Sequence, residues 1–269
     1  MMKGKRARNL KSEEEPQKRL DPIHRIPIER DSDYGEDTNP HHTPLIAPGV
    51  EKIDVFMGNV VPDLVQKLKD ERYSVVFGCV AWLTHEGVLK GLADKIAQVV
   101  VQKEDFLRPD LPARAGAPPM DKARLRTLYY DIRGIDRNQF GLGMNCNGDP
   151  DTEGVRCVGY SKDAGRGRPV MHNKFLVFGE LEVENHYGGY DDKGELEIVC
   201  QSFSFVPKAV WTGSANLTSA SEANAENAMW IESQKVAMVY YREWKRMLVM
   251  SEPLDWDSDY VAPEYRYGT

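Results

Sequence analysis

The chain has 269 residues, of which 41% are apolar and 29% are charged, and this composition suits a globular protein with a core of its own. No apolar run approaches the roughly 20 residues needed to span a bilayer, and the basic start of the chain lacks the apolar stretch of a secretory signal. The four cysteines show no CxxC spacing, so we expect no zinc site, no disulfides, and a reducing, cytoplasmic location.

The net charge of −7 is unevenly distributed along the chain. Residues 180–197 hold seven acids and one lysine, so this segment carries −6 and the rest of the chain about −1. Just upstream, residues 156–168 hold four basic side chains against one acid. Because the local field decides which ligands a site attracts, the acidic total does not exclude a polyanionic partner.

Residues 1–49 are polar, rich in charge and proline, and lack hydrophobic periodicity, which predicts a disordered or loosely packed N-terminal arm. The first eleven residues carry five basic groups and no acid. They could contact nucleic acid or serve as a nuclear address, although a solvated tail is the plainer interpretation. Periodicity begins near residue 50, and we expect one domain over 50–255, followed by a C-terminal tail over 256–269.

The first part of this domain alternates between strand and helix patterns. Strands are expected at 52–58, 73–83 and 97–104, and helices at 60–71 and 85–96, with Thr84 as the cap of the second helix. This order is typical of parallel units in which helices cross between strands. The predicted class is α/β, with a mostly parallel or mixed central sheet flanked by helices on both faces.

The second part contains a helix at 122–132, a turn-rich loop at 141–154 and an apolar strand at 169–178. After the acidic segment we expect two further strands at 195–205 and 208–214, a strand at 228–231 and a closing amphipathic helix at 237–249. Trp82, Trp211 and Trp230 lie in apolar strand patterns, so we expect them in the core rather than as platforms for stacking bases.

His172 and Lys174 stand inside the apolar run 169–178. Side chains alternate between the two faces of a strand, so this spacing predicts that both point the same way. Burying an unpaired ammonium is costly. Either an acid such as Glu226 neutralises the pair in a structural salt bridge, or the pair lines a cavity that binds an anion.

A second cluster of polar side chains follows the strand at 208–214. Ser214 and Asn216 come at the end of this strand, where hydroxyl, amide and backbone N–H groups make a seat for a phosphate or an oxyanion. Glu226 precedes the next strand and could accept a hydrogen bond from an imidazole, which would fix its tautomer.

Three motifs, taken in chain order, resemble the signature of the phospholipase D superfamily. They are His172-Asn173-Lys174, the GSAN stretch that ends at Asn216, and Glu226-Asn227. The resemblance covers roughly residues 50–250 and implies a phospholipase D-like catalytic domain. Two features depart from the family pattern. Gly179 stands where the family often has an aspartate, five residues after the lysine, and 38 residues separate Lys174 from the GSAN stretch. The acidic insertion 180–197 fills that interval and could be a lid, a specificity loop, a dimer element or an inert insertion.

The family uses two H-x-K motifs in one active site, and none of the other five histidines of this chain is followed by a lysine two positions later. The resemblance therefore implies a homodimer, in which His172 of one copy attacks phosphorus and the histidine of the second copy donates the proton. It assigns phosphate binding to Lys174, Ser214 and Asn216, and the orientation of the imidazole to Glu226.

Two arginines upstream of the strand, Arg166 and Arg168, either steer phosphates toward this site or belong to a solvated loop. No metal or other cofactor is expected, because the lysines would supply the positive charge.

The expected function is that of a metal-independent phosphodiesterase, above all a nuclease that hydrolyses DNA or RNA through a phosphohistidine intermediate. One alternative is a phospholipase or cardiolipin-type lipid phosphodiesterase, and another is a catalytically silent scaffold that binds nucleic acid. Nucleic acid is the expected partner, and membrane lipid less so. The sequence leaves open DNA against RNA, and hydrolysis against transfer to an alcohol.

Overall fold

The structure is a computed structural model that describes residues 52–103, 122–136, 144–145, 151–159, 170–190, 193–254 and 266–267. The predicted N-terminal arm (1–49), most of the predicted C-terminal tail, and both Arg166 and Arg168 lie outside the described residues.

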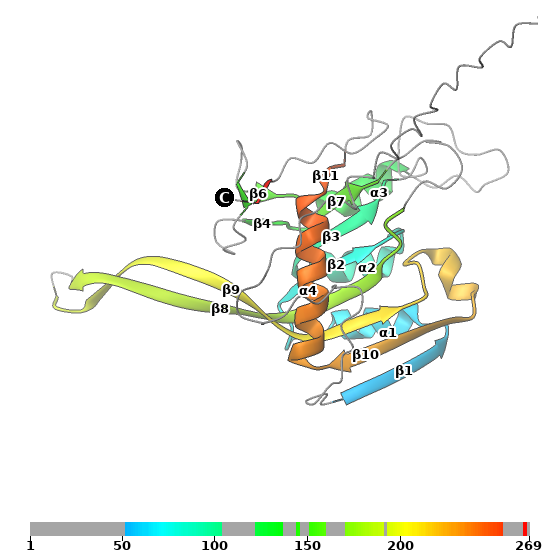
Figure 1. The fold of residues 1–269 in the computed structure, drawn as a ribbon, viewed down its shortest axis with the longest axis horizontal. Helices are drawn as coiled ribbons and strands as arrows, with labels where there is room; N and C mark the ends of the chain where they lie inside the picture. The colour runs from blue at the N-terminus through cyan, green and yellow to red at the C-terminus, as the bar shows by residue number, and fades with distance from the viewer. Residues whose placement is uncertain are drawn as a thin grey trace, which may run out of the picture.

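The centre of the fold is an eight-stranded sheet with the strand order β1-β10-β9-β8-β2-β3-β7-β11 (Figure 1). Its strands are β1 (Lys52–Gly58), β2 (Val75–Val80), β3 (Ile96–Gln102), β7 (Val155–Val158), β8 (Lys174–Tyr190), β9 (Leu196–Gly213), β10 (Glu226–Glu232) and β11 (Glu252–Pro253). Two small sheets pair β4 (Ile135–Asp136) with β6 (Asp151–Thr152), and β5 (Met144–Asn145) with β12 (Arg266–Tyr267).

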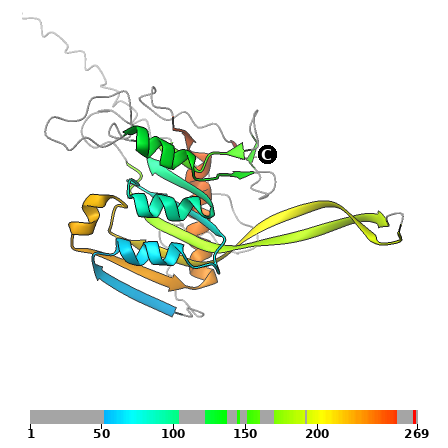
Figure 2. The ribbon, with the colours of Figure 1, turned by 180° about the vertical axis from the view of Figure 1, so that it is seen from behind.

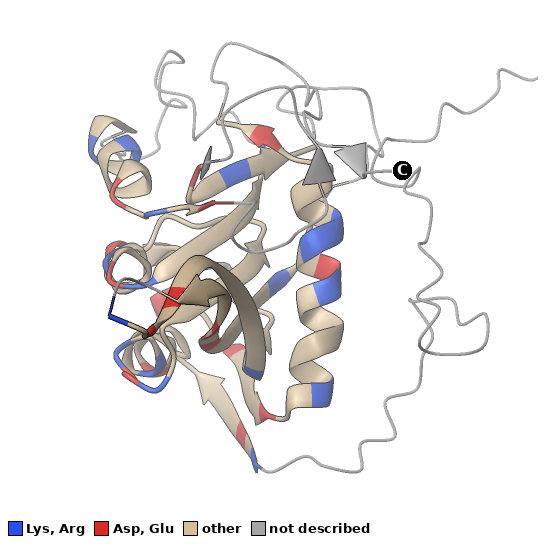
Figure 3. Cartoon of the chain, turned by 90° about the vertical axis from the view of Figure 1, so that its left-hand side faces the viewer, with Lys and Arg blue, Asp and Glu red and all other residues tan. Residues whose placement is uncertain are grey.

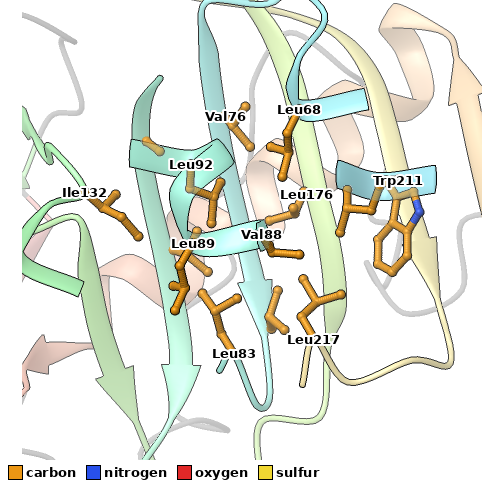
Figure 4. Packing of buried hydrophobic residues seen from close by; sticks show 14 of the residues in the cluster. Leu68, Val76, Leu83, Val88, Leu89, Leu92, Ile132, Leu176, Trp211 and Leu217 are labelled. Carbon is orange, nitrogen blue, oxygen red and sulfur yellow. The ribbon is translucent and has the colours of Figure 1, made fainter. Parts of the chain in front are cut away.

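Helices cover both faces of the large sheet (Figures 1 and 2). They are α1 (Val61–Leu68), α2 (Glu86–Ala93), α3 (Lys122–Tyr130) and α4 (Gln234–Val249), and a 3-10 helix, η3, spans Ser219–Ala223. The first three pack on one face, where Figure 4 shows Leu68, Val88 and Leu92 against Leu176 and Trp211. Helix α4 packs on the other face. No helix among the described residues is long and apolar enough to cross a membrane.

The predicted class, α/β with a mixed central sheet and helices on both faces, is confirmed. Within the sheet the parallel pairs are the minority. Strand β2 is parallel to β3, and β3 is parallel to β7, whereas the other neighbouring strands run antiparallel. The crossover through α2 imposes the parallel β2–β3 pair, and the direct β8–β9 hairpin imposes an antiparallel one.

The two strands predicted at 195–205 and 208–214 form the single strand β9, so the predicted break between them is wrong. Pro207 lies where the register with β8 shifts, since Phe178 pairs with Ala209 and the next residue of β8, Gly179, pairs with Pro207. A proline has no N–H for the ladder and is tolerated at such a bulge, so the strand continues through it.

Beyond Gly179 the strands β8 and β9 leave the sheet and continue as a long two-stranded ribbon (Figure 1). We call residues 180–190 and 193–206 the β-arm. Most of the acidic insertion lies in this ribbon, which therefore extends two sheet strands rather than forming a separate loop.

The polar residues singled out in the sequence gather at one edge of the sheet. Val80 at the end of β2 pairs with Lys174 at the start of β8, and Gly213 at the end of β9 pairs with Ala228 near the start of β10. The β-arm begins at Glu180, at the other end of β8, so it projects from the opposite edge (Figures 1 and 2). It is therefore not a lid over the site of its own chain.

Candidate active site

Lys174 is the first residue of β8 and is almost completely buried, with 7% of its surface exposed. Its backbone is held in the ladder opposite Val80, and its carbonyl accepts a hydrogen bond from the Thr212 hydroxyl at 3.1 Å. The strand thus fixes the position of the Lys174 backbone, and burial keeps water away from most of the side chain.

The Lys174 ammonium contacts His172 at three points. Its Nζ lies 3.1 Å from both Nδ1 and Nε2 of the ring and donates to the His172 carbonyl at 3.0 Å. The predicted strand at 169–178 begins late, at Lys174, so His172 precedes the strand and its side chain is exposed. The two side chains meet although His172 lies outside the strand.

Burial lowers the pKa values of both groups. The pKa of His172 lies below its ordinary value of 6.5, because its surroundings remove part of its hydration and because the Lys174 ammonium repels an imidazolium. Burial also lowers the pKa of Lys174, and the negative charge of Glu226 acts in the opposite direction. A neutral imidazole is therefore favoured beside a cation, which is the state a nucleophile needs.

Ser214 and Glu226 form a second pair at the same edge of the sheet. The Ser214 hydroxyl donates to Glu226 Oε2 at 2.5 Å and accepts from the Asn227 N–H at 3.0 Å. The Asn224 amide donates to the other carboxylate oxygen at 3.3 Å. Among the described residues no hydrogen bond joins Glu226 to His172, so the orienting role of this carboxylate stays a proposal.

Asn216 follows in the same loop, between the buried residues Ala215 and Leu217. Its side-chain Oδ1 is buried and has no hydrogen-bond partner within the described part of the chain. An unpaired buried amide costs free energy until a partner reaches it. The Asn216 side chain can therefore accept a further hydrogen bond that the described part of the chain does not provide.

His85 is a structural residue of this region that the sequence reasoning missed. It caps α2, because its Nδ1 accepts from the Val88 N–H at 3.2 Å, so the assignment of the cap to Thr84 is wrong by one residue. Its Nε2 lies 2.9 Å from a carboxylate oxygen of Glu222 in η3. Histidine is not among the favoured N-cap residues. Its second role here is the contact with Glu222, which is distant in the sequence. This contact ties the loop between Asn216 and Glu226 to the helix.

Two other expectations differ from the structure. Trp211 and Trp230 are buried as predicted, but Trp82 follows the end of β2 and is 37% exposed. Arg156, one of the four basic side chains of residues 156–168, is buried in β7, where it forms an ion pair with Glu153 and donates to the Ser251 hydroxyl at 2.8 Å. It therefore belongs to the sheet and not to the field around the site.

The described residues contain no group of three or more His, Cys, Asp or Glu side chains placed to hold a metal ion. What the edge does bring together is an imidazole, a buried ammonium and a hydrogen-bonded serine–carboxylate pair. The imidazole can supply a nucleophile, and the ammonium can supply a positive charge to an anion.

No family model matches this chain. A protein of Acanthamoeba polyphaga mimivirus, described as uncharacterised, is 28% identical over 222 residues, which are 76% of this chain and 67% of that protein.

Two similar solved structures are the phospholipase D family member Nuc from Salmonella typhimurium and NucT from Helicobacter pylori. Nuc is 16% identical, with a TM-score of 0.41 over 75% of this chain and 97% of its own. NucT is 13% identical, with a TM-score of 0.43 over 76% of this chain and 99% of its own.

Proposed function

We propose that this chain is a metal-independent phosphodiesterase of the phospholipase D superfamily that hydrolyses nucleic acid. In this proposal His172 is the nucleophile, Lys174 binds the phosphate, and two copies of the chain complete one active site. The observation that carries the proposal is the buried Lys174 ammonium, which lies 3.1 Å from both ring nitrogens of His172.

The arrangement favours phosphoryl chemistry over a structural salt bridge. A structural pair would place an acid directly on the ammonium, whereas the hydrogen bonds of Glu226 go to Ser214 and Asn224. Its charge still acts on Lys174 through space. The ammonium thus contacts only the imidazole and a carbonyl among the described side chains and backbone. A bound phosphate would supply the anion that such a cation needs.

The reaction proceeds in two displacements. The neutral imidazole of His172 forms a bond to phosphorus as the bond from phosphorus to the leaving oxygen breaks, and the leaving oxygen takes a proton from the histidine of the second copy. Water then attacks the phosphorus of the phosphohistidine, and the bond from phosphorus to the imidazole breaks, which releases the His172 that acted as nucleophile. The attacking water gives its proton to the histidine of the second copy. Lys174 and the amide N–H groups of Asn216 hold the phosphate oxygens on which charge develops, and the Ser214 hydroxyl joins them by exchanging its hydrogen bond to Glu226 for one to the phosphate.

A second copy is required because one chain contains a single H-x-K motif, and an imidazole that has just attacked phosphorus cannot also donate a proton. A two-fold axis beside the site edge would bring two His172–Lys174 pairs together. Cations from both copies would then face one phosphate.

Nucleic acid is the preferred substrate class because the indole of Trp82 is partly exposed at this edge. Val80 pairs with Lys174, and the Ala81 N–H donates to the Asn173 carbonyl at 2.8 Å. The next residue along the chain, Trp82, therefore lies opposite the region of His172. An exposed indole is a sequence-tolerant platform for a base, worth about 1–3 kcal/mol for each stacked base.

Cleavage of labelled single- and double-stranded DNA and RNA in EDTA tests the proposal. We expect the wild type to cleave nucleic acid, His172→Ala to lose cleavage, and the control His186→Ala, which alters an exposed histidine on the β-arm, to keep it. Cleavage that survives in His172→Ala contradicts the proposal. Hydrolysis of phospholipid vesicles instead of nucleic acid would keep the chemistry and replace the substrate.

A further inference from the structure

The proposed function leaves the β-arm without a role. The arm projects from the edge of the sheet opposite His172 (Figure 1), and Figure 3 looks along it, with α4 on one side of the sheet and the other helices on the opposite side. Its eleven residues in β8 reach roughly 35 Å beyond the sheet at the usual rise of a strand. A ribbon of this length with no other strand beside it is marginally stable in water.

The arm has one acidic face. Glu180, Glu182 and Glu184 alternate along β8 and therefore point to the same side, and their partners in β9 include Ser204 and Ser202. These carboxylates repel one another and favour solvent, so this face is unsuited to pack against a copy of itself.

The other face of the arm is mostly apolar, with one polar pair in its middle, Asn185 and Gln201, whose side chains hydrogen-bond to each other at 2.8 Å. The pairs Val183–Phe203, Tyr187–Ile198 and Tyr190–Leu196 stand directly opposite one another across the two strands, and cross-strand partners share a face. The same face begins inside the protein, where the ring of Phe205 lies 4.8 Å from Phe77 and 4.9 Å from Tyr241 of α4. The apolar face of the arm therefore continues the core beneath α4 out into solvent.

Five of these side chains are largely exposed: Val183 48%, Tyr187 52%, Tyr190 73%, Leu196 55% and Ile198 47%. Together these residues expose on the order of 500 Å² of surface, which lies within the range of about 300–600 Å² for the largest apolar patch on a typical monomer. The face is thus large enough to take part in a protein contact.

We propose that the apolar face of the β-arm packs against the same face of a second copy across a two-fold axis. The face is uncharged along these three residue pairs, so two copies meet without burying a charge, and both acidic faces remain turned to solvent. About 500 Å² from each copy gives roughly 1,000 Å² in total, the lower bound for a specific protein interface. Nucleic acid or an anionic lipid surface would instead be repelled by the seven acids of segment 180–197.

This contact is separate from the shared active site, because the arm and His172 lie at opposite edges of the sheet. Two different two-fold contacts in one chain build a tetramer or a longer assembly. If the active-site dimer does not form, the arms alone would give a dimer. In either case, loss of the arm contact reduces the mass of the particle by at least half.

The test introduces two carboxylates on one face of the arm in the full chain. Val183→Glu with Ile198→Glu alters the apolar face, and the matched control, Cys200→Glu with Ser204→Glu, adds the same charge to the acidic face. Light scattering should give the wild type and the control equal masses, and the apolar-face variant half of that mass or less. Equal masses for all three proteins would overturn the proposal.

Two further measurements keep the result specific. Thermal unfolding of the three proteins should agree within a few degrees, since these side chains lie in the exposed arm. Flotation with phosphatidylcholine vesicles tests the alternative occupant, because vesicle binding that only the apolar-face variant loses, with no change of mass, would assign the face to lipid and overturn the proposal. Cleavage per chain in EDTA should be equal in all three, so its loss throughout would count against the proposed function alone.

Discussion

At the scale of single residues, the decisive feature is a lysine placed where lysines seldom lie. The ammonium of Lys174 is buried beside an imidazole, and removing a charge from water costs several kcal/mol unless partners replace the water. The His172 carbonyl and the field of Glu226 replace it in part. The site is therefore stable enough to form, while the ammonium has no direct anionic partner among the described residues.

The same pair makes a prediction about titration. The neutral form of His172 should persist to a lower pH than in an ordinary histidine, so its midpoint should lie below 6.5. Replacing Lys174 by Met removes the repulsion of the imidazolium, and the midpoint should rise. An NMR titration of the His172 ring measures both values.

Lys208→Met is the matched control for this titration, since Lys208 lies at the far edge of the sheet and forms an ion pair with Glu180 at 3.4 Å. Its loss should leave the His172 midpoint unchanged. A midpoint that stays the same or falls in Lys174→Met would show that the ammonium does not set the state of the imidazole.

Some residues of the site could be read from the sequence and others could not. The spacing of His172, Lys174, Ser214 and Glu226 is a local pattern, and the structure brings them to one edge in two hydrogen-bonded pairs. The exposure of Trp82 depends on where β2 ends, which the continuous apolar run conceals. Hydrophobic periodicity carries no information about the residue at which such a strand ends.

At the scale of elements, Gly179 explains one departure from the family pattern. It lies at the register shift between β8 and β9, and a Cβ at this position would stand 2.2 Å from the Val206 carbonyl and 2.5 Å from the Phe205 ring. An aspartate therefore does not fit where the family often has one. The close approach of β8 and β9 at Gly179 therefore accounts for the missing aspartate, and the β-arm begins at the next residue.

Gly179→Asp should destabilise the protein rather than restore a catalytic feature. The clash is with backbone, which cannot move without breaking the ladder, so we expect a loss of about 1–3 kcal/mol in the free energy of unfolding. Urea denaturation measures this loss. Ser204→Asp places the same charge on the exposed arm and should change stability by less than about 0.5 kcal/mol. Equal stability of the two variants would contradict the packing described for Gly179.

Helix and strand patterns predicted most elements of the sheet and its helices, but not how the strands pair. The amphipathic runs at 60–71 and 237–249 became α1 and α4. The four-residue strand β7 was missed because its buried Arg156 makes it look like part of a charged loop. The single strand β9 was divided at Pro207 because the bulge that accommodates a proline is set by the partner strand.

At the scale of the whole molecule, the chain carries two proposed contact regions at opposite edges of the sheet. One edge of the sheet carries the His172–Lys174 pair, and the opposite edge carries the β-arm. The proposed active site requires a contact between copies at the first edge, and the arm offers a contact at the second. Each contact can be removed without touching the other.

A hybrid dimer tests the sharing of the active site. Two tagged chains that carry Val183→Glu and Ile198→Glu, one of them also His172→Ala, leave only the site contact to join them. Loss of one of the two histidines should lower cleavage by about 100-fold or more, because general acid catalysis contributes on the order of 10²–10⁴. A hybrid in which one chain carries His186→Ala instead should be fully active. Half activity in the first hybrid would mean that each copy works alone.

The most direct test of the central claim is to trap the covalent intermediate on His172. Single-turnover cleavage in EDTA, stopped by denaturant at alkaline pH and followed by mass spectrometry of the peptide that contains His172, should show a nucleotide attached to that imidazole, and the adduct should decay as product is released. Cleavage that proceeds with no adduct on His172, or with an adduct on another residue, would contradict the account.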